Sequence, residues 1–356
     1  MRFGVFWQTP GYEGSSAARR HWETIEEIVL AEELGFETAW LAESAFYPTR
    51  PMSNPLMVAI AAAQKTERIR FGTLAAQAPL HHPFHMATQS ATCDILTGGR
   101  LELCLGGRWG SPTGRFLGNP VDVSSKESRE RVAEGIALMK KAWTEEEVNF
   151  QGKYWSAEDL PVLPKPVQKP HPPILLAANS DDTFSYAAGL GVGVIGTLLS
   201  QPMPRMVERL AEFEAASASG EPAHAQPAQA QKVCVMVPFF VADTRREAQE
   251  VASQNWRDSD REAGIAYMRR RGVDPSAPDF ATGAVGWMTW DFARAPEVCI
   301  YGEPSACVER LQSIREQLPT MNECILEFNR RGRIRTERVR ESMQLFAERV
   351  MPGLKT

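Results

Sequence analysis

The alternation of short apolar runs with amphipathic helical patterns constrains the fold of this chain more than any other feature of its sequence. Eight runs are typical of strands, and each is followed by at least one helical segment. The runs lie at 2–8, 36–42, 69–76, 101–105, 173–178, 191–197, 232–241 and 323–328. Continuous apolar strands indicate a parallel sheet that is covered on both faces. Eight such units in 356 residues predict an α/β fold, a closed (β/α)8 TIM barrel, with a doubly wound open sheet as the alternative.

Three stretches interrupt the alternation, and we expect them to be insertions. Residues 106–126 are glycine-rich and follow strand 4. Residues 144–172 include a proline-rich stretch that must be extended, because proline lacks an N–H and clashes in a helix interior. The long segment 242–320 separates strands 7 and 8. The sequence therefore predicts insertions after strands 4 and 7 of one barrel domain over residues 1–356.

The composition excludes several classes of protein. The 39 basic and 44 acidic residues give a net charge of −5, and no apolar run approaches the roughly 20 residues that span a bilayer. The arginine-rich run 330–340 is interleaved with Glu337, which favours a solvated helix start over a nucleic-acid contact. The N-terminus lacks the pattern of a signal peptide, and the six cysteines form no CxxC pair. We expect a cytoplasmic protein with reduced, buried thiols that binds neither a membrane nor nucleic acid.

Two motifs have simpler explanations than the ligands they suggest. The glycines of GVGVIG (191–196) match a dinucleotide fingerprint, but they surround a strand instead of joining a strand to a helix. Close packing of that strand explains them. His81, His82 and His85 resemble a zinc-binding pair on a helix, but Pro83 lies between them. We expect these histidines to line a pocket or cap a helix, and we expect no metal.

The segment AANSDDTFSYAA (177–188) carries polar residues where a strand ends and a helix begins. Two interpretations are open. Ser180, Asp181 or Asp182 can cap the helix by accepting hydrogen bonds from its first N–H groups. Alternatively, those N–H groups and the hydroxyls of Ser180 and Thr183 can bind a phosphate, because a helix N-terminus favours anions. In that case the two aspartates must point away from the anion.

Four blocks of the sequence, taken together and in order, resemble the bacterial luciferase-like flavin-dependent monooxygenases. They are GFETAWLAES (35–44), the long block 53–107, FQGKYW (150–155) and 164–183, and the C-terminal ECILEF run fits the same family. The resemblance covers nearly the whole chain. It implies a (β/α)8 barrel that is commonly dimeric and binds reduced FMN at the C-terminal ends of its strands. It also implies O2 as co-substrate and a separate flavin reductase, although one branch of the family uses the deazaflavin F420.

The resemblance carries over to the cofactor-binding residues one by one. Asn179, Ser180 and Thr183 match the phosphate segment. The phosphate-binding arginine of the family corresponds to Arg108, which is displaced by one position in Gly106-Gly107-Arg108. The third-strand end matches Leu74-Ala75, where luciferase has a non-proline cis peptide beneath the isoalloxazine ring.

The catalytic positions depart from the family pattern. Glu43 matches the acidic residue after the second strand, but Ser44 stands where luciferases carry a histidine. Serine cannot take up a proton near neutral pH, so a base must come from elsewhere or the step must need none. His81 and His82 are replacements by position, beside Glu43. The predicted catalytic set is therefore Glu43, Ser44, His81 and His82.

These observations predict an enzyme that uses reduced FMN and O2 to oxygenate an apolar small molecule. A carbonyl compound is the expected substrate, oxidised by a Baeyer–Villiger type step. One alternative is an F420-dependent oxidoreductase that transfers hydride without O2. Another is a flavin-binding protein without catalytic activity, which the serine at position 44 favours. The expected partners are a flavin reductase and a second copy of the chain.

Overall fold

The computed structural model describes residues 1–9, 14–44, 51–107, 124–219, 231–255, 299–330 and 334–354. Eight parallel strands close into a barrel, because each pairs with the next and the last pairs with the first. In order around the barrel they are β1 (Arg2–Trp7), β2 (Thr38–Leu41), β3 (Arg70–Thr73), β5 (Leu101–Gly106), β8 (Ile174–Ala178), β9 (Gly193–Thr197), β10 (Val233–Val241) and β12 (Glu323–Glu327). The predicted TIM barrel is confirmed, and each expected strand is present within a few residues of its predicted bounds.

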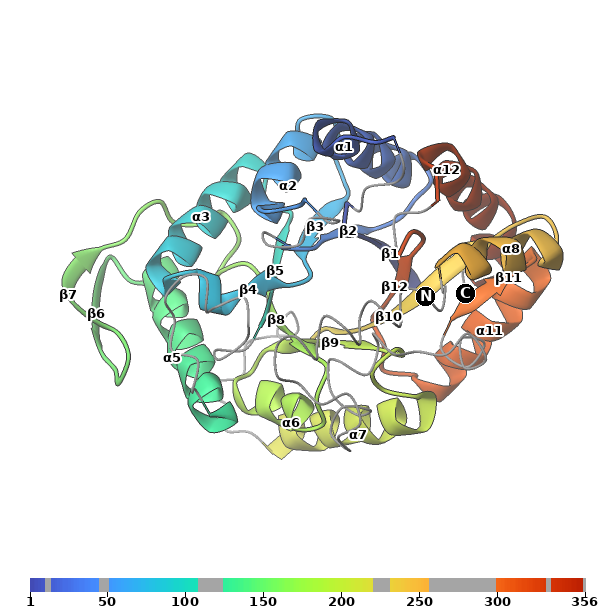
Figure 1. Ribbon diagram of the computed structural model, residues 1–356. Coiled ribbons are helices and arrows are strands. Elements are labelled where there is room, and N and C mark those ends of the chain that lie inside the picture. The colour runs from blue at the N-terminus through green and yellow to red at the C-terminus, as the bar shows by residue number, and fades with distance from the viewer. Residues whose placement is uncertain are drawn as a thin grey trace, which may run out of the picture.

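Helices surround the barrel as a ring (Figure 1). They are α1 (Ala17–Glu33), α2 (Pro55–Ala63), α3 (Pro83–Leu96), α5 (Ser125–Thr144), α6 (Asp182–Gly189), α7 (Met203–Ser219), α8 (Arg245–Asn255), α11 (Pro304–Gln317) and α12 (Thr336–Leu345). After α12 the chain continues as a π-helical turn, Phe346–Val350, and a 3-10 turn, Met351–Leu354. Phe346 packs against the rings of Phe3, Phe239 and Phe328, which fastens this C-terminal segment to the strands. Within the described ranges, every helix is too short or too polar to cross a bilayer.

Several short elements lie in the predicted insertions. β6 (Glu147–Gln151) and β7 (Ser156–Pro161) form an antiparallel hairpin that projects from the barrel on the left of Figure 1. Glu134 of α5 anchors the turn of this hairpin by accepting hydrogen bonds from three consecutive backbone N–H groups, those of residues 153–155. β11 (Ile300–Gly302) lies in the third insertion, whereas β4 (Ala76–Gln77) and the 3-10 helix Ala78–Leu80 lie outside the insertions, after β3.

Trp40 fills the interior of the barrel near the N-terminal ends of the strands, which we call the lower end. Its indole is fully buried between Gly4 and Gly72. A Cβ atom would lie 2.1 Å from the indole if placed on Gly72, and 2.9 Å from it if placed on Gly4. The indole Nε1 donates a 2.8 Å hydrogen bond to Glu323. These two glycines therefore leave the space that the tryptophan occupies.

Four charged side chains close the lower end. Lys232 Nζ lies 2.5 Å from a carboxylate oxygen of Glu323 and 2.7 Å from one of Glu102, which also accepts a 2.7 Å hydrogen bond from Arg70 Nε. Burial acts to lower the pKa of Lys232 and to raise that of Glu102, but the opposite charges outweigh it. The pKa of Lys232 is therefore raised and that of Glu102 lowered, so both groups stay charged in the folded protein.

The arginine-rich run behaves differently at its two ends. Arg338 and Arg340 form surface ion pairs with Glu341 and Glu26, as expected of a solvated helix. Arg330 contradicts the expectation, because it is only 4% exposed and lies 2.8 Å from Glu327 in the barrel.

Among the predicted glycine positions, Gly193 and Gly196 lie within β9 and face close neighbours, which confirms the packing interpretation.

Candidate functional site

The C-terminal ends of the strands, which we call the upper end, are where barrel enzymes place their active sites. Small residues line the interior here. A Cβ atom on Gly106 would lie 2.7 Å from the Cβ of Ala75 and 3.4 Å from that of Ala177. Ala42 belongs to the same interior cluster. The peptide bond between Leu74 and Ala75 is cis, as the resemblance implies. These small residues form a mostly apolar floor at the upper end.

Glu43 and His81 meet at the edge of this floor. Glu43 follows β2 and is 8% exposed, whereas His81 follows the 3-10 helix after β4. Nε2 of His81 lies 2.7 Å from Oε1 of Glu43, and the other carboxylate oxygen accepts a 2.5 Å hydrogen bond from the backbone N–H of Gln77. The backbone therefore fixes the carboxylate, and the carboxylate orients the imidazole. This pair can hold and transfer a proton at the upper end.

The other two predicted catalytic residues are placed differently. Ser44 is 7% exposed, and its backbone N–H donates a 2.7 Å hydrogen bond to the carbonyl of Met52. His82 is the N-cap of α3, where its Nδ1 accepts from the N–H of Phe84 at 3.2 Å. Partial burial and the neighbouring His85 lower the pKa of His82. The structure therefore pairs Glu43 with His81, and gives His82 the capping role that was one of its two expected roles.

The polar segment after β8 leads into the N-terminus of α6. Asp181 is the N-cap residue, but within the described part of the chain its carboxylate makes no capping hydrogen bond to this helix. The prediction that Asp181 could cap this helix is therefore wrong. Oγ of Ser180 lies 2.8 Å from Oγ1 of Thr183, so the two hydroxyls stand together at the helix end. Asn179 lies beside them and accepts a 3.4 Å hydrogen bond from Ser200.

Two arginines from neighbouring helices hold the aspartates of this segment. Arg205 of α7 pairs with Asp181, and this hydrogen bonding lowers the pKa of the Asp181 carboxyl. Arg129 of α5 lies 2.7 Å from Asp182. The sequence analysis did not identify either arginine, because each lies in an ordinary helical pattern far from residue 180. Arg108, the predicted phosphate ligand, lies outside the described residues.

A second buried polar group lies across the barrel, at the ends of β1 and β12. The side-chain amide of Gln8 donates to one carboxylate oxygen of Glu327, and Arg330 Nη1 donates to the other at 2.8 Å. All three residues are at most 9% exposed. These three residues were not predicted from the sequence, although one signal was present. Glu323, Ile325 and Glu327 alternate along a buried strand, which places a carboxylate inside the barrel at each end.

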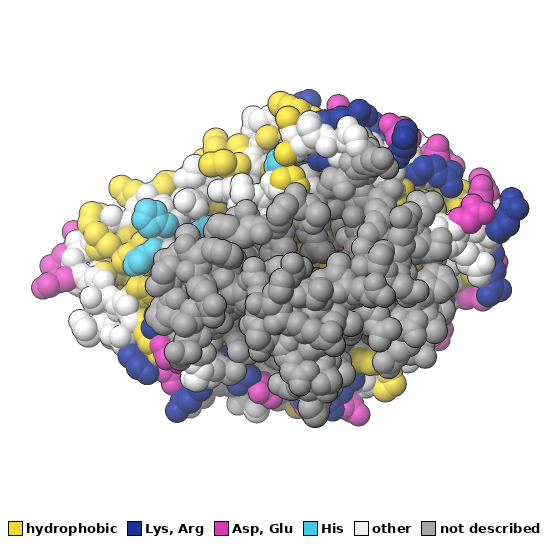
Figure 2. All heavy atoms as spheres, viewed as in Figure 1, with side chains coloured by type: hydrophobic (Ala, Val, Ile, Leu, Met, Phe, Trp, Pro, Cys, Tyr) yellow, Lys and Arg dark blue, Asp and Glu magenta, His cyan; other side chains and the backbone are white. Residues whose placement is uncertain are grey.

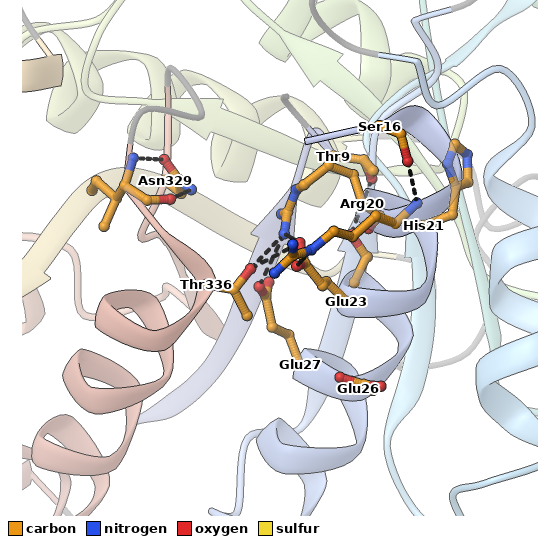
Figure 3. Close-up of polar contacts among 12 residues, drawn as sticks. Thr9, Ser16, Arg20, His21, Glu23, Glu26, Glu27, Asn329 and Thr336 are labelled. Carbon is orange, nitrogen blue, oxygen red and sulfur yellow. Dashed lines mark hydrogen bonds and ion pairs between the residues drawn. The ribbon is translucent and has the colours of Figure 1, made fainter. Parts of the chain in front are cut away.

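A buried network supports the upper end of β1 from outside the barrel (Figure 3). The indole of Trp7 points outward and donates a 2.7 Å hydrogen bond to Glu27 of α1. Arg20 lies between Glu23 and Thr336 of α12, and its Nη1 is 2.6 Å from the Thr336 hydroxyl. Burial raises the pKa of Glu27 against the opposing effect of Arg20. This network joins α1, α12 and β1, and therefore fixes the strand end that carries Gln8.

Comparisons with known proteins agree with this architecture. A family model described as luciferase-like monooxygenase matches residues 1–321. The chain is 24% identical over 255 residues to the oxygenase component of a flavin-dependent trigonelline monooxygenase from Acinetobacter baylyi, which is 71% of this chain and 69% of that protein. It is also 32% identical over 196 residues to an F420-dependent glucose-6-phosphate dehydrogenase from Kineococcus radiotolerans. That match covers 52% of this chain and 56% of the dehydrogenase.

Two solved structures illustrate the same fold. The monooxygenase RslO1 from Streptomyces bottropensis has a TM-score of 0.78 and 26% identity, with complete coverage of both chains. The oxygenating constituent of 3,6-diketocamphane monooxygenase from Pseudomonas putida, a type II Baeyer–Villiger enzyme in complex with FMN, has a TM-score of 0.75 and 20% identity. The latter match covers 99% of this chain and 98% of the other.

Proposed function

Because the chain belongs to the luciferase-like monooxygenase family, we propose that it is the oxygenase component of a two-component enzyme that uses reduced FMN and O2. The observation that carries the proposal is the combination, on one barrel end, of a floor of small apolar residues and an exposed pair of hydroxyls at a helix N-terminus. A planar ring fits the former and a phosphate the latter. When bound, the reduced flavin would supply the electrons that activate O2.

Ser180, Thr183 and the first N–H groups of α6 are the proposed ligands of the cofactor phosphate. Negative charge at this helix end would ordinarily oppose an anion, since Asp181 and Asp182 lie there. Arg205 and Arg129 offset that charge. Leu74 and Ala75 would lie beneath the ring, and Asn179 and Arg108 remain predicted ligands.

Glu43 and His81 are proposed to hold the proton that the reaction at the upper end requires. The pair would have the role of the histidine that the family carries at the position of Ser44. The pair is fixed at 2.7 Å, and Glu43 is shielded from water. Replacing Glu43 by Gln should alter the pH dependence of the reoxidation of bound reduced FMN, whereas Ser44→Ala should leave it unchanged. An unchanged profile in Glu43→Gln would remove this role.

The proposed substrate is an apolar small molecule with a carbonyl group, oxidised by a Baeyer–Villiger type step. The apolar residues of the upper end support an apolar substrate, because they would exclude water from the reacting groups. The Baeyer–Villiger relative in complex with FMN supports the reaction class by analogy of fold.

The decisive experiment compares reduced FMN with reduced F420. Each cofactor is mixed anaerobically with the protein, binding is measured by fluorescence, and air-saturated buffer is then added. We expect tight binding of FMN. We also expect the absorbance of oxidised flavin to return at a rate that differs from the rate for free flavin. Selective binding of F420, with no effect on reoxidation, would favour the second candidate, a hydride-transferring F420 enzyme. The F420-dependent relative at 32% identity is the observation that supports this candidate.

Two partners complete the proposal. A separate flavin reductase would supply the reduced cofactor, in the cytoplasm, where the six buried free thiols would remain reduced.

A second copy of the chain would cover α2 and α3. Helix α2 contains no charged residue, and Met57 and Leu96 are 69% and 48% exposed. Figure 2 shows hydrophobic and uncharged side chains along this edge, whereas charged ones gather around α8 and α12. Met57→Glu with Leu96→Glu should give a monomer in sedimentation experiments.

A further inference from the structure

A small cavity lies between α3, α5 and the outer face of β5. Met86 of α3, Leu105 of β5, and Ile136 and Met139 of α5 form its apolar walls, and His81 lies at its edge. Its volume is about 30 Å³. Enclosed apolar cavities of about 150 Å³ stay dry and bind benzene or xenon; this one is smaller and partly open, and its lining is mostly apolar. This cavity is too small for a ring or a long alkyl chain, and it suits a diatomic molecule or a single xenon atom.

Gly135 keeps the cavity open. It lies in the interior of the 20-residue helix α5, where glycine is less favourable than alanine by roughly 1 kcal/mol. Nothing in the backbone requires glycine here, since its φ is not in the left-handed region. A Cβ atom would meet Pro83 at 3.4 Å and Trp155 at 3.7 Å, which are ordinary contacts. The chain therefore accepts a less stable helix at a position where a methyl group would fit and would fill part of the cavity.

Two polar residues of the lining, His81 and Arg131, form bonds with other groups. Nε2 of His81 is hydrogen-bonded to Glu43. The guanidinium of Arg131 donates to Glu127 at 2.8 Å and 3.1 Å and lies 4.2 Å from the ring centre of Tyr154. A water molecule needs two to four polar partners to occupy a buried site. The cavity therefore favours an apolar occupant over water.

The cavity is one strand away from the floor of the upper end. Leu105 lines the cavity, and the next residue, Gly106, faces Ala75 inside the barrel. Leu105 is in register with Ala76, which follows the Leu74–Ala75 peptide. At the edge, His81 lines the cavity and also bonds Glu43 at the floor. The cavity and the proposed flavin site therefore share a wall.

We propose that this cavity is a dioxygen site that holds O2 beside the flavin floor, with Gly135 as the residue that keeps it open. The proposal rests on the proposed function, because only an oxygenase needs a store of O2 at this position. Size, apolar lining and the wall shared with the floor support dioxygen over an organic substrate.

The first test uses xenon, which needs neither cofactor nor activity. Crystals of the full chain are pressurised with xenon, and the same is done with Gly135→Ala. We expect one xenon atom in contact with Met86, Leu105 and Met139 in the wild type, and its loss in the variant. An empty cavity in the wild type would overturn the proposal. Since no flavin is involved, this outcome is independent of whether the proposed function holds.

The second test measures the second-order rate constant for reaction of O2 with reduced FMN bound to the protein. Gly135→Ala should lower this constant by about threefold or more, because the methyl group removes space for O2. Gly189→Ala is the matched control, since it also adds a methyl group to a helix, but in open space. An unchanged constant in Gly135→Ala would overturn the role in O2 supply. Failure of reduced FMN to bind would instead contradict the proposed function.

Discussion

The two ends of the barrel use glycine and buried charge in opposite ways. At the lower end, Gly4 and Gly72 lack side chains so that Trp40 can fill the interior. At the upper end, Gly106 adds no side chain beside Ala75 and Ala177, and Gly135 behind it lines a small cavity. The same residue type thus permits dense packing at one end and leaves room for ligands at the other.

The polar and charged groups at the two ends differ in a similar way. Lys232 at the lower end is enclosed by two carboxylates, and each of them has a further partner. At the upper end, the side chain of His81 is 21% exposed, and the hydroxyls of Ser180 and Thr183 are bonded to each other near solvent. Polar groups whose hydrogen-bond partners all lie inside the protein stabilise the fold, whereas groups that can form further hydrogen bonds can bind a ligand. Substitutions of these particular groups should therefore affect stability at the lower end and binding at the upper end.

The largest effect is expected for Glu323→Ala. The substitution leaves the Lys232 ammonium with one carboxylate fewer and the Trp40 indole N–H without its acceptor. Removing one partner of a buried ion pair costs about 3–5 kcal/mol. Urea unfolding followed by circular dichroism measures the loss. Glu323→Gln retains an acceptor and should cost less; equal losses in the two variants would mean that the charge is unimportant.

Gly72→Ala should destabilise the protein by about 2–3 kcal/mol through overpacking. Its new methyl group would lie 2.1 Å from the Trp40 ring, which is held between two strands and cannot move aside. The double variant Gly72→Ala with Trp40→Phe should recover part of the loss, because the smaller ring leaves space. A loss that Trp40→Phe does not reduce would show that the clash lies elsewhere.

At the upper end, Ser180→Ala with Thr183→Ala should weaken FMN binding at least about tenfold, which corresponds to 1.4 kcal/mol. Its effect on the free energy of unfolding should be smaller, because both hydroxyls lie near the surface. Fluorescence titration with FMN gives the dissociation constant. Ser185→Ala, on an exposed position of the same helix, is the control. An unchanged dissociation constant in the double variant would exclude these hydroxyls as phosphate ligands.

The sequence predicted the barrel strands better than the elements that connect them. The barrel strands were predictable because strands covered on both faces are continuous apolar runs such as LELCL. The β6–β7 hairpin was not, because its strands are mostly exposed and carry polar residues without a regular alternation. The insertions that contain it were predicted by their glycine and proline content.

The candidate site depends on contacts between residues far apart in the chain. Glu43 and His81 are 38 residues apart, and no local pattern shows that a carboxylate follows one strand where an imidazole follows another. The resemblance supplied Glu43, and position in the chain suggested His81, but neither indicated that the two residues pair. Glu327 lay within an apolar run, so its inward direction was visible only from the alternation with Glu323 and Ile325. Gly135 gave no signal in sequence, since only the structure shows the space beside it.

The smallest predicted effect concerns two buried carboxylates whose pKa values shift in opposite directions. Glu102 at the lower end lies between Lys232 and Arg70, and these charges lower its pKa despite burial. Glu27 behind the upper end of β1 has Arg20 at 3.6 Å, and there burial prevails and raises its pKa. These two buried acids differ because Glu102 has two cationic partners at 2.7 Å, whereas the nearest cation to Glu27, Arg20, lies at 3.6 Å.

Opposite shifts predict opposite pH dependence of stability. The unfolded-state pKa of Glu is about 4.3. Glu102, with its lowered pKa, stabilises the fold above that value, and this contribution is lost as the pH falls through its folded-state pKa. Glu27, with its raised pKa, binds its proton more tightly in the folded state. In the wild type, the contribution of Glu27 to the free energy of unfolding therefore declines as the pH rises from about 4.3 through its folded-state pKa. Above that pKa the contribution is constant.

Replacing Glu27 by Gln removes that decline, because an amide does not titrate and its oxygen can still accept from Trp7. The variant should match the wild type near pH 4 and be slightly more stable than the wild type at pH 7. Glu102→Gln should show the reverse, with a loss at pH 7 that shrinks in acid. Urea unfolding of the three proteins across this pH range measures both. A loss of stability in Glu27→Gln at every pH would mean that the Glu27 carboxylate is charged and that Arg20, rather than burial, controls its ionisation.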